Sequence, residues 1–129
     1  MVVCTNVGDA AREVAEYLSG FSYLWSTERD LQDGIWEVLE RSGFAVQREL
    51  ALTRRDRPDF TVEVGGFRVV VEVKIAGPLN TVLRQLGRYA EHPDVKGIVL
   101  ASGKRTLLAG VPPLLHGKPI ALALTAGRL

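Results

Sequence analysis

Two strand-like stretches on either side of a glycine pair form the clearest pattern of hydrophobic and polar positions in the chain. Residues 59–64 alternate polar and apolar side chains, as a half-buried strand does, and residues 67–75 are rich in β-branched side chains. Gly65-Gly66 between them predicts a two-residue hairpin turn, because the primed turns of hairpins need positive φ. The register that this turn sets pairs Val64 with Phe67, Glu63 with Arg68, Val62 with Val69, Thr61 with Val70, Phe60 with Val71 and Asp59 with Glu72.

Helical periodicity precedes this hairpin in two segments. The first runs to about Leu18, and Asp9 is placed to act as its N-cap, because its side chain can accept from the first free amides. The second begins at a cap formed by Ser26 or Thr27 and ends before Gly43. The apolar residues of the second helix recur at helical spacing and predict a buried stripe of Leu31, Ile35, Val38 and Leu39.

A third helix follows the hairpin, and the remaining elements are strands. Gly77-Pro78 breaks the chain, and residues 79–91 then show helical spacing. The predicted apolar face of this helix consists of Val82, Leu83, Leu86 and Ala90. Strands are predicted over residues 44–52, 95–101 and 119–124, with a basic turn at residues 103–105 and an irregular stretch around Pro112-Pro113.

The resulting element order is α-α-β-β-β-α-β-β within a single domain, residues 1–129. This order predicts an α/β fold with a mixed sheet, in which the hairpin is antiparallel. The helix at residues 79–91 is expected to make a right-handed crossover to a parallel strand.

Composition excludes several classes of protein. The 129 residues carry a formal net charge of +1, so nucleic-acid binding would depend on local basic patches. The single cysteine, Cys4, rules out an intrachain disulfide and a cysteine-based zinc site, which suits a reducing cytoplasm. The start of the chain lacks the features of a signal peptide, and no stretch approaches the roughly 18 apolar residues of a membrane span. We therefore expect a cytoplasmic protein with no membrane partner.

The predicted register places chemistry on one face of the hairpin. Asp59 and Glu72 are directly paired, with Cβ atoms roughly 5 Å apart, and Lys74 follows two residues later on the same face. Paired like charges destabilise a hairpin, so a cation is expected to neutralise them. Two carboxylates and the backbone carbonyl of Val73 are hard oxygen donors suited to Mg²⁺ or Mn²⁺. Such an ion lowers the pKa of bound water and offsets charge on a phosphate in the transition state.

The run Pro58-Asp59 followed by Glu72-Val73-Lys74 resembles the PD-(D/E)XK, or restriction-endonuclease-like, nuclease superfamily. The resemblance covers a core of about residues 26–101. It implies a helix, an antiparallel three-strand meander, a crossover helix and a further strand, here with an extra N-terminal helix and C-terminal strand. It also implies that Asp59 and Glu72 ligate the metal and that Lys74 is the catalytic lysine.

Many members of this superfamily add an acidic residue from the first core helix. Glu28 is our choice for that acid, and Glu37 and Glu40 are weaker choices. An ordinary role for Glu28 also exists, because an acid in the first turn of a helix stabilises the helix dipole.

A second motif supports the same resemblance. Gln85 and Tyr89 lie four residues apart and share a helix face. They resemble the QxxxY element of the RecB-like branch, and in that branch the element lies beside the active site and DNA. Arg84 and Arg88 flank this surface as candidate phosphate contacts. Further candidates for substrate binding precede Asp59 in the chain, namely Arg55 and Arg57, with Arg54 in the same charged stretch.

Other conspicuous residues have ordinary interpretations. Glu49 fits a surface position on a strand, Lys104-Arg105 fits a solvated turn as well as a phosphate contact, and neither His92 nor His116 is needed for this chemistry. The aromatic residues expected in the core are Tyr23, Trp25 and Trp36.

The sequence therefore predicts a nuclease that hydrolyses DNA with Mg²⁺ or Mn²⁺ and acts in repair, recombination or defence. A non-catalytic nucleic-acid-binding or assembly module on the same fold is the alternative, because a fold does not fix a function. A plain α/β interaction domain is the third interpretation. The short chain leaves little surface for substrate recognition, which favours a homodimer or a partner protein.

Overall fold

The computed structural model describes residues 6–128, except for the side chains at positions 7 and 128. The helices of this part of the chain are α1 (Val7–Ser19), α2 (Glu28–Glu40), α3 (Leu79–Ala90) and α4 (Arg105–Leu108). The strands are β1 (Tyr23–Leu24), β2 (Ala45–Arg48), β3 (Phe60–Val64), β4 (Phe67–Val73), β5 (Gly97–Ser102), β6 (Leu114–Leu115), β7 (Lys118–Leu124) and β8 (Gly127–Arg128).

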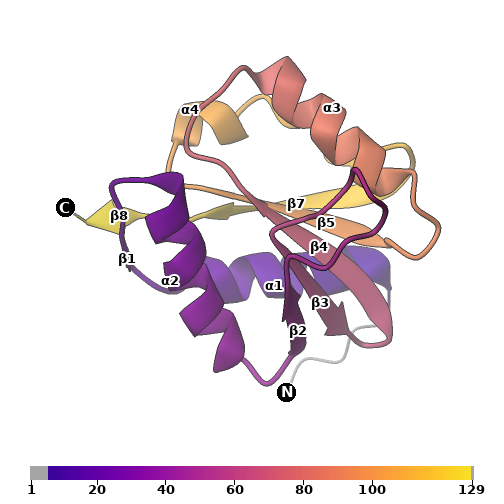
Figure 1. Cartoon of the computed structure of the whole chain (residues 1–129), viewed down its shortest axis with the longest axis horizontal. Coiled ribbons are helices and arrows are strands. Elements are labelled where there is room, and N and C mark those ends of the chain that lie inside the picture. The colour runs from indigo at the N-terminus through magenta and orange to yellow at the C-terminus, as the bar shows by residue number, and fades with distance from the viewer. Residues whose placement is uncertain (1–5, 129) are drawn as a thin grey trace.

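A six-stranded mixed sheet forms the centre of the fold, in the order β2-β3-β4-β5-β7-β6 (Figure 1). Strands β2, β3 and β4 form an antiparallel meander, whereas β4, β5 and β7 are parallel neighbours. The crossover from β4 to β5 runs through α3, so the predicted parallel connection is confirmed. The short strands β1 and β8 pair with each other in a separate two-stranded sheet.

Helices cover both faces of the sheet (Figure 1). Helices α1 and α2 pack on one face, where Leu18, Leu31 and Phe60 are fully buried in the same apolar cluster. Helices α3 and α4 cover the other face, where Leu86 packs with Leu100 in a second cluster. The alternation along β4 explains this division, because Val71 and Val73 enter the first cluster and Val70 enters the second.

The hairpin forms as predicted. Gly65 and Gly66 have φ values of 57° and 83°, the positive pair that a type I′ turn requires. The register from Val64↔Phe67 to Phe60↔Val71 matches the predicted pairs. Strand β3 begins one residue after Asp59, so the sixth predicted pair lies just outside the ladder.

Helix α2 also agrees with the sequence pattern. Thr27 is its N-cap and forms a capping box with Asp30, which accepts from the Thr27 backbone N–H. The predicted stripe faces the core, with Leu31, Ile35 and Leu39 fully buried. Val38 is only half-buried, because it lies at the edge of this face.

Several predicted boundaries are wrong. Asn6, not Asp9, caps α1, and its side chain accepts from the Asp9 backbone N–H. The strand expected over residues 44–52 ends at Arg48, because Glu49 adopts a φ of 55° that no regular strand tolerates. The basic turn at residues 103–105 leads into α4, and the stretch after Pro112-Pro113 contains β6.

Candidate active site

The two predicted carboxylates meet where β3 begins and β4 ends. The Asp59 backbone N–H donates to Glu72 Oε1 over 3.3 Å. Glu72 is buried with 3% exposure, and Asp59 is half-buried. The hairpin register thus brings both acids to one place, although Asp59 itself makes no ladder pair.

Lys74 joins this pair, as the sequence predicts. It follows the last residue of β4, and its Nζ lies 3.4 Å from Glu72 Oε2. The Lys74 backbone N–H donates to the Ala101 carbonyl, which fixes the residue against β5. The ammonium group therefore lies beside the carboxylate pair, on a backbone that is fastened to the neighbouring strand.

Helix α2 contributes two side chains to the site. Glu28 Oε1 accepts from the Ile75 backbone N–H over 3.2 Å, and Gln32 Nε2 donates to Asp59 Oδ1 over 3.1 Å. The two residues lie one helical turn apart and so share a face. Of the three acids considered on this helix, Glu28 is the one at the site, whereas Glu37 and Glu40 lie farther along α2.

Helix α3 reaches Glu72 from the opposite side. Gln85 Nε2 donates to the Tyr89 hydroxyl over 3.0 Å, and that hydroxyl donates to Glu72 Oε1 over 3.1 Å. Tyr89 is 1% exposed, so it contacts Glu72 rather than the surface. The predicted pair thus shares a helix face, and Gln85 is linked to Glu72 through the Tyr89 hydroxyl.

The backbone of Val73 also faces Asp59. Its N–H donates to Asp59 Oδ2 over 2.7 Å, while the next N–H along the chain, from Lys74, points to β5. The N–H and C=O of one strand residue point to the same side of the strand. The Val73 carbonyl therefore lies on the side of Asp59.

Burial raises the pKa of both acids, and a neighbouring negative charge adds to the effect at each of them. Burial is the main cause for Asp59, whose pKa rises to about 6. The charge of Glu28 raises this pKa further, whereas the Val73 N–H and the charge of Lys74 lower it. Burial also raises the pKa of Glu72, to about 7, assisted by the charge of Asp59 and opposed by Lys74. The pair therefore resists carrying two negative charges unless more positive charge is present.

The donor set fits a hard divalent cation. Among residues 6–128, no group of three or more histidine, cysteine, aspartate or glutamate side chains is arranged as a metal site. Mg²⁺ does not need such a cage, because it keeps several waters and typically binds one or two carboxylates plus substrate phosphates. Asp59, Glu72 and the Val73 carbonyl are oxygen donors of that kind.

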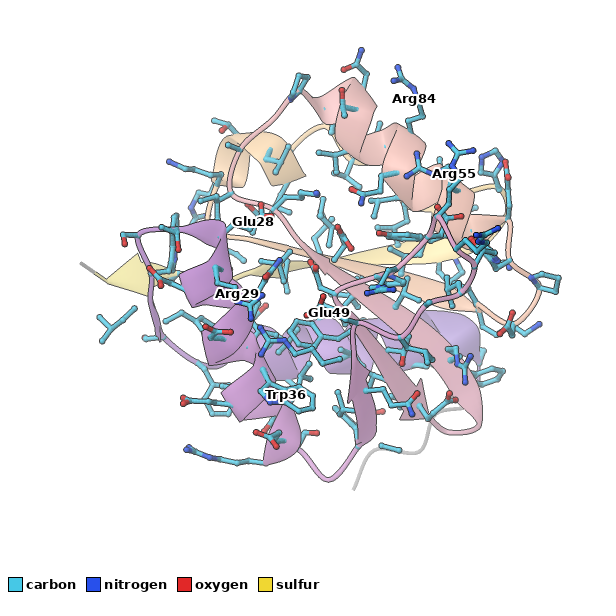
Figure 2. All side chains as sticks on the ribbon, viewed as in Figure 1. Glu28, Arg29, Trp36, Glu49, Arg55 and Arg84 are labelled. Atoms are coloured by element: carbon cyan, nitrogen blue, oxygen red, sulfur yellow. The ribbon has the colours of Figure 1, made fainter. Side chains whose placement is uncertain are left out.

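The remaining predicted substrate residues fall into two groups. Arg55, Arg57 and Arg84 are not buried, and Figure 2 shows Arg55 and Arg84 pointing outward beside α3. Arg88 lies on α3 as well, but its Nε donates to Asp56 Oδ1 over 3.0 Å. Arg88 thus has a partner within the protein that its sequence context did not indicate.

Sequence reasoning missed Gln32 and Asp56 as members of this region. Gln32 had one available signal, since it lies four residues after Glu28 on the same helix face. Asp56 had no such signal, because its side-chain partners Arg88 and His92 lie 32 and 36 residues further along the chain. His92, considered dispensable for the chemistry, places Nε2 3.0 Å from Asp56 Oδ2.

Several of the ordinary interpretations are confirmed. Tyr23 is buried, and its hydroxyl donates to the Leu18 carbonyl. Trp25 and Trp36 are only partly buried and pack against the first apolar cluster, where Trp36 stacks on Phe60. The strand position predicted for Glu49 is wrong, because Glu49 lies at the turn out of β2 (Figure 2). Lys104 and Arg105 are exposed at the start of α4.

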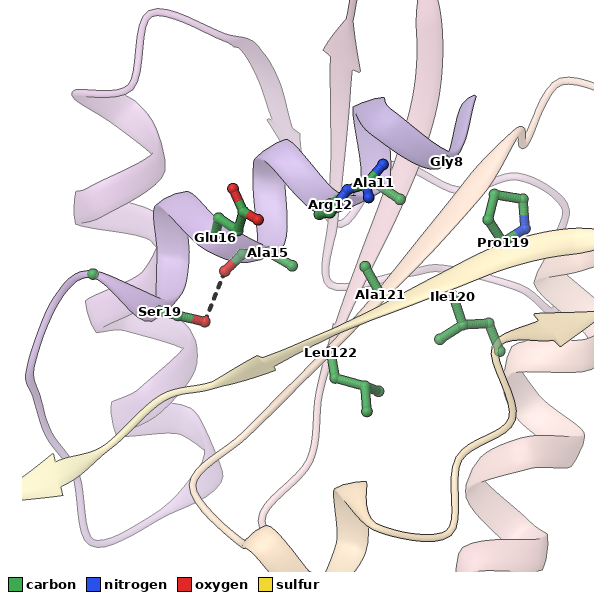
Figure 3. A pocket seen from close by; sticks show the side chains of 11 residues that line it. Gly8, Ala11, Arg12, Ala15, Glu16, Ser19, Pro119, Ile120, Ala121 and Leu122 are labelled. Atoms are coloured by element: carbon green, nitrogen blue, oxygen red, sulfur yellow. Dashed lines mark hydrogen bonds between the residues drawn. The ribbon is translucent and has the colours of Figure 1, made fainter. Parts of the chain in front are cut away.

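A groove between α1 and β7 lies apart from these residues (Figure 3). It is lined by small residues of α1, including Ala11 and Ala15, and by residues 119–122 of β7. None of the carboxylates described above reaches it. The candidate chemistry therefore lies at the meander side of the sheet and not in this groove.

No family model, curated protein or solved structure matches this chain. Within the described residues, no helix is both long and apolar enough to cross a membrane.

Proposed function

We propose that the protein is a Mg²⁺- or Mn²⁺-dependent nuclease that hydrolyses phosphodiester bonds of DNA. The observation that carries this proposal is that the Asp59 backbone N–H donates to Glu72 Oε1, with Lys74 Nζ 3.4 Å from the same glutamate. Two desolvated acids next to a lysine at a strand end form the minimal set of groups for metal-assisted phosphodiester hydrolysis. No nucleophilic side chain is needed.

The resemblance to the PD-(D/E)XK superfamily supports the proposal. The order α2, β2–β3–β4, α3, β5, with an antiparallel meander and a crossover helix, is the order that a restriction-endonuclease-like core requires. The two carboxylates and the lysine occupy the positions in this order that the resemblance assigns to catalysis. The contact between Tyr89 and Glu72 supports the assignment to the RecB-like branch.

In this mechanism Asp59, Glu72 and the Val73 carbonyl would hold the cation. When bound, the ion would supply an activated water at neutral pH and offset charge on the phosphate. Lys74 adds a fixed positive charge beside that position, which stabilises the pentavalent transition state. Glu28 adds negative charge next to Asp59, which strengthens attraction for a cation.

The surrounding hydrogen bonds keep the acids in place for this task. Gln32 holds one oxygen of Asp59, and Tyr89 holds one oxygen of Glu72. Partners of this kind fix the orientation of metal ligands, and removing them typically costs 10–100-fold in affinity or activity, on the order of one to three kcal/mol.

A panel of labelled linear, circular, flap and branched DNA substrates with Mn²⁺ tests the proposal. Wild-type protein is expected to cleave at least one of them, and Asp59→Ala protein none. Asp94→Ala is the matched control, because Asp94 is exposed and pairs with Arg68 away from the site. Full activity in purified Asp59→Ala protein would overturn the assignment.

A non-catalytic nucleic-acid-binding module is the second candidate, and one observation favours it. Each of the four carboxylate oxygens already has a partner: Gln32 and Val73 for Asp59, and Tyr89, the Asp59 amide and Lys74 for Glu72. A site satisfied without a cation can survive after catalysis is lost. Salt-sensitive DNA binding without any binding of Mg²⁺ or Mn²⁺ would select this candidate.

A further inference from the structure

Asp56 is a buried acid that the proposed chemistry does not use. It is 7% exposed and lies in residues 49–59, the connection from β2 to β3, which we name the arginine loop. Its carboxylate has two side-chain partners from the region of α3. Arg88 Nε donates to Oδ1 over 3.0 Å, and His92 Nε2 lies 3.0 Å from Oδ2. These three residues are named the Asp56 clamp.

The loop around Asp56 is organised locally as well. The Asp56 carbonyl accepts from the Leu52 backbone N–H over 2.8 Å, and Thr53 Oγ1 accepts from the Asp56 backbone N–H over 3.2 Å. Asp56 therefore closes a tight turn and presents its carboxylate to α3. Burial raises the pKa of this carboxyl, but the hydrogen bonds from His92 and Arg88 have the larger combined effect. The pKa of Asp56 therefore lies below its ordinary value, and its carboxylate stays negatively charged.

The clamp fixes where a group of arginines lies. The members of this group are Arg54, Arg55 and Arg57 of the arginine loop and Arg84 of α3, none of them buried, and we name them the arginine surface. Arg84 lies one helical turn before Arg88, so it shares the face of α3 to which the loop is fastened. Figure 2 shows Arg55 and Arg84 on this outer side of α3.

Both segments that carry the arginine surface also carry residues of the candidate site. The loop that carries it ends at Asp59, and the neighbouring residues of α3, Gln85 and Tyr89, connect to Glu72. Gathering positive charge in one place is unfavourable unless an anion binds there. Arginine is suited to phosphate, because its planar fork of donors matches phosphate oxygens.

We propose that Asp56 is a positioning residue that fastens the arginine loop to α3 and so assembles the arginine surface as a binding site for phosphates of DNA. The identification of the phosphates as those of DNA rests on the proposed function. The fastening of the loop does not rest on it, because the loop can be probed without DNA.

Limited trypsin digestion tests the fastening. Trypsin cleaves after arginine, so Arg54 and Arg55 report opening of the loop, whereas Pro58 protects the bond after Arg57. We expect Asp56→Asn to speed cleavage in the loop by about tenfold or more, as loss of charge-assisted hydrogen bonds implies. Cleavage after the exposed Arg41, at the end of α2, is the internal reference, since global unfolding would speed both.

Two further variants keep this test decisive. Asp94→Asn is the matched control and is expected to leave loop cleavage unchanged, because Asp94 is exposed and pairs with Arg68. His92→Ala removes one partner while leaving the loop sequence intact, and it replaces Asp56→Asn if that variant does not fold. Unchanged loop cleavage in a folded clamp variant would overturn the proposal.

Binding of a labelled DNA duplex without metal tests the arginine surface. The slope of log affinity against log salt is expected to become shallower in Asp56→Asn by about one for each phosphate that an arginine no longer neutralises. Faster loop cleavage with weaker DNA binding supports the proposal, and faster cleavage with unchanged affinity overturns the phosphate assignment. Wild-type protein that binds no DNA would refute the proposed function, while trypsin would still decide whether the clamp exists.

Discussion

The Tyr89 hydroxyl donates a hydrogen bond to Glu72 Oε1 over 3.1 Å and joins helix α3 to the carboxylate pair. Burial raises the pKa of this hydroxyl well above its ordinary value, with the Glu72 charge acting in the same direction, so the group stays a donor. Gln85 donates to the same hydroxyl oxygen and fixes its orientation. The pair thus holds Glu72 in one rotamer from a helix distant in sequence.

Replacing Tyr89 by phenylalanine removes this donor and keeps the ring. Affinity for Mn²⁺, measured by calorimetric titration, is expected to fall about 10–100-fold, because Glu72 no longer has the bond that orients it. Stability should fall by only about 1 kcal/mol.

Tyr17→Phe provides the matched control for this variant. In the wild-type protein, the Tyr17 hydroxyl donates to the Val38 carbonyl over 3.0 Å, in a part-buried position on the other side of the sheet. It should show a similar decrease in stability and no decrease in metal affinity. Equal Mn²⁺ affinities in Tyr89→Phe and wild type would contradict the positioning role of Tyr89.

Lys74→Ala separates catalysis from metal binding. Removal of the ammonium group is expected to lower kcat by roughly 10²–10³-fold, since it removes a charge that stabilises the transition state. Mn²⁺ affinity should not fall, because the positive charge beside Glu72 competes with a cation. Steady-state cleavage assays and metal titrations measure the two effects, with the exposed Lys96→Ala as control. A decrease of Mn²⁺ affinity in Lys74→Ala would contradict this division of roles.

Gly103 tests how the end of β5 is held to the small β1–β8 sheet. A methyl group on Gly103 would overlap the rigid Trp25 ring and approach the Thr125 carbonyl to 3.2 Å. Gly103→Ala is therefore expected to destabilise the protein by about 1–3 kcal/mol in urea unfolding. Gly110→Ala is the control, because its methyl would meet only the flexible end of the Leu79 side chain. Equal destabilisation in both variants would show that Trp25 has room to move.

Local sequence was sufficient to predict the carboxylate pair. The register of a two-residue hairpin follows from the turn, so Gly65-Gly66 already determined that Asp59 and Glu72 would meet. A cap at Ser26 or Thr27 and the stripe of α2 were likewise predictable, because both depend on neighbours within a few turns. The type of each long element was therefore predicted correctly, although the strand expected over residues 44–52 ends at Arg48.

The contacts that complete the site were not predictable in this way. Gln32 and Asp59 are 27 residues apart, and Arg88 and Asp56 are 32 apart. Such pairs depend on how helices pack against the sheet, which periodicity does not determine. The two-residue strand β6 and the four-residue helix α4 are too short to show a period at all.

The raised pKa values of Asp59 and Glu72 predict how stability depends on pH. Both groups bind a proton more tightly in the folded protein than in the unfolded chain. Their contribution to stability is therefore complete below the unfolded pKa values, which are near 4. It is lost as pH rises through the folded pKa values, about 6 for Asp59 and about 7 for Glu72. Without metal, these two groups should make the protein less stable at about pH 8 than at about pH 5.

Mg²⁺ binds the ionised pair, so the increase in Tm that it causes should grow over the same interval. Thermal unfolding with and without Mg²⁺ measures both trends, and the Asp59→Asn, Glu72→Gln double variant should flatten them. A Mg²⁺-induced Tm shift that is independent of pH would contradict a metal site at these two acids.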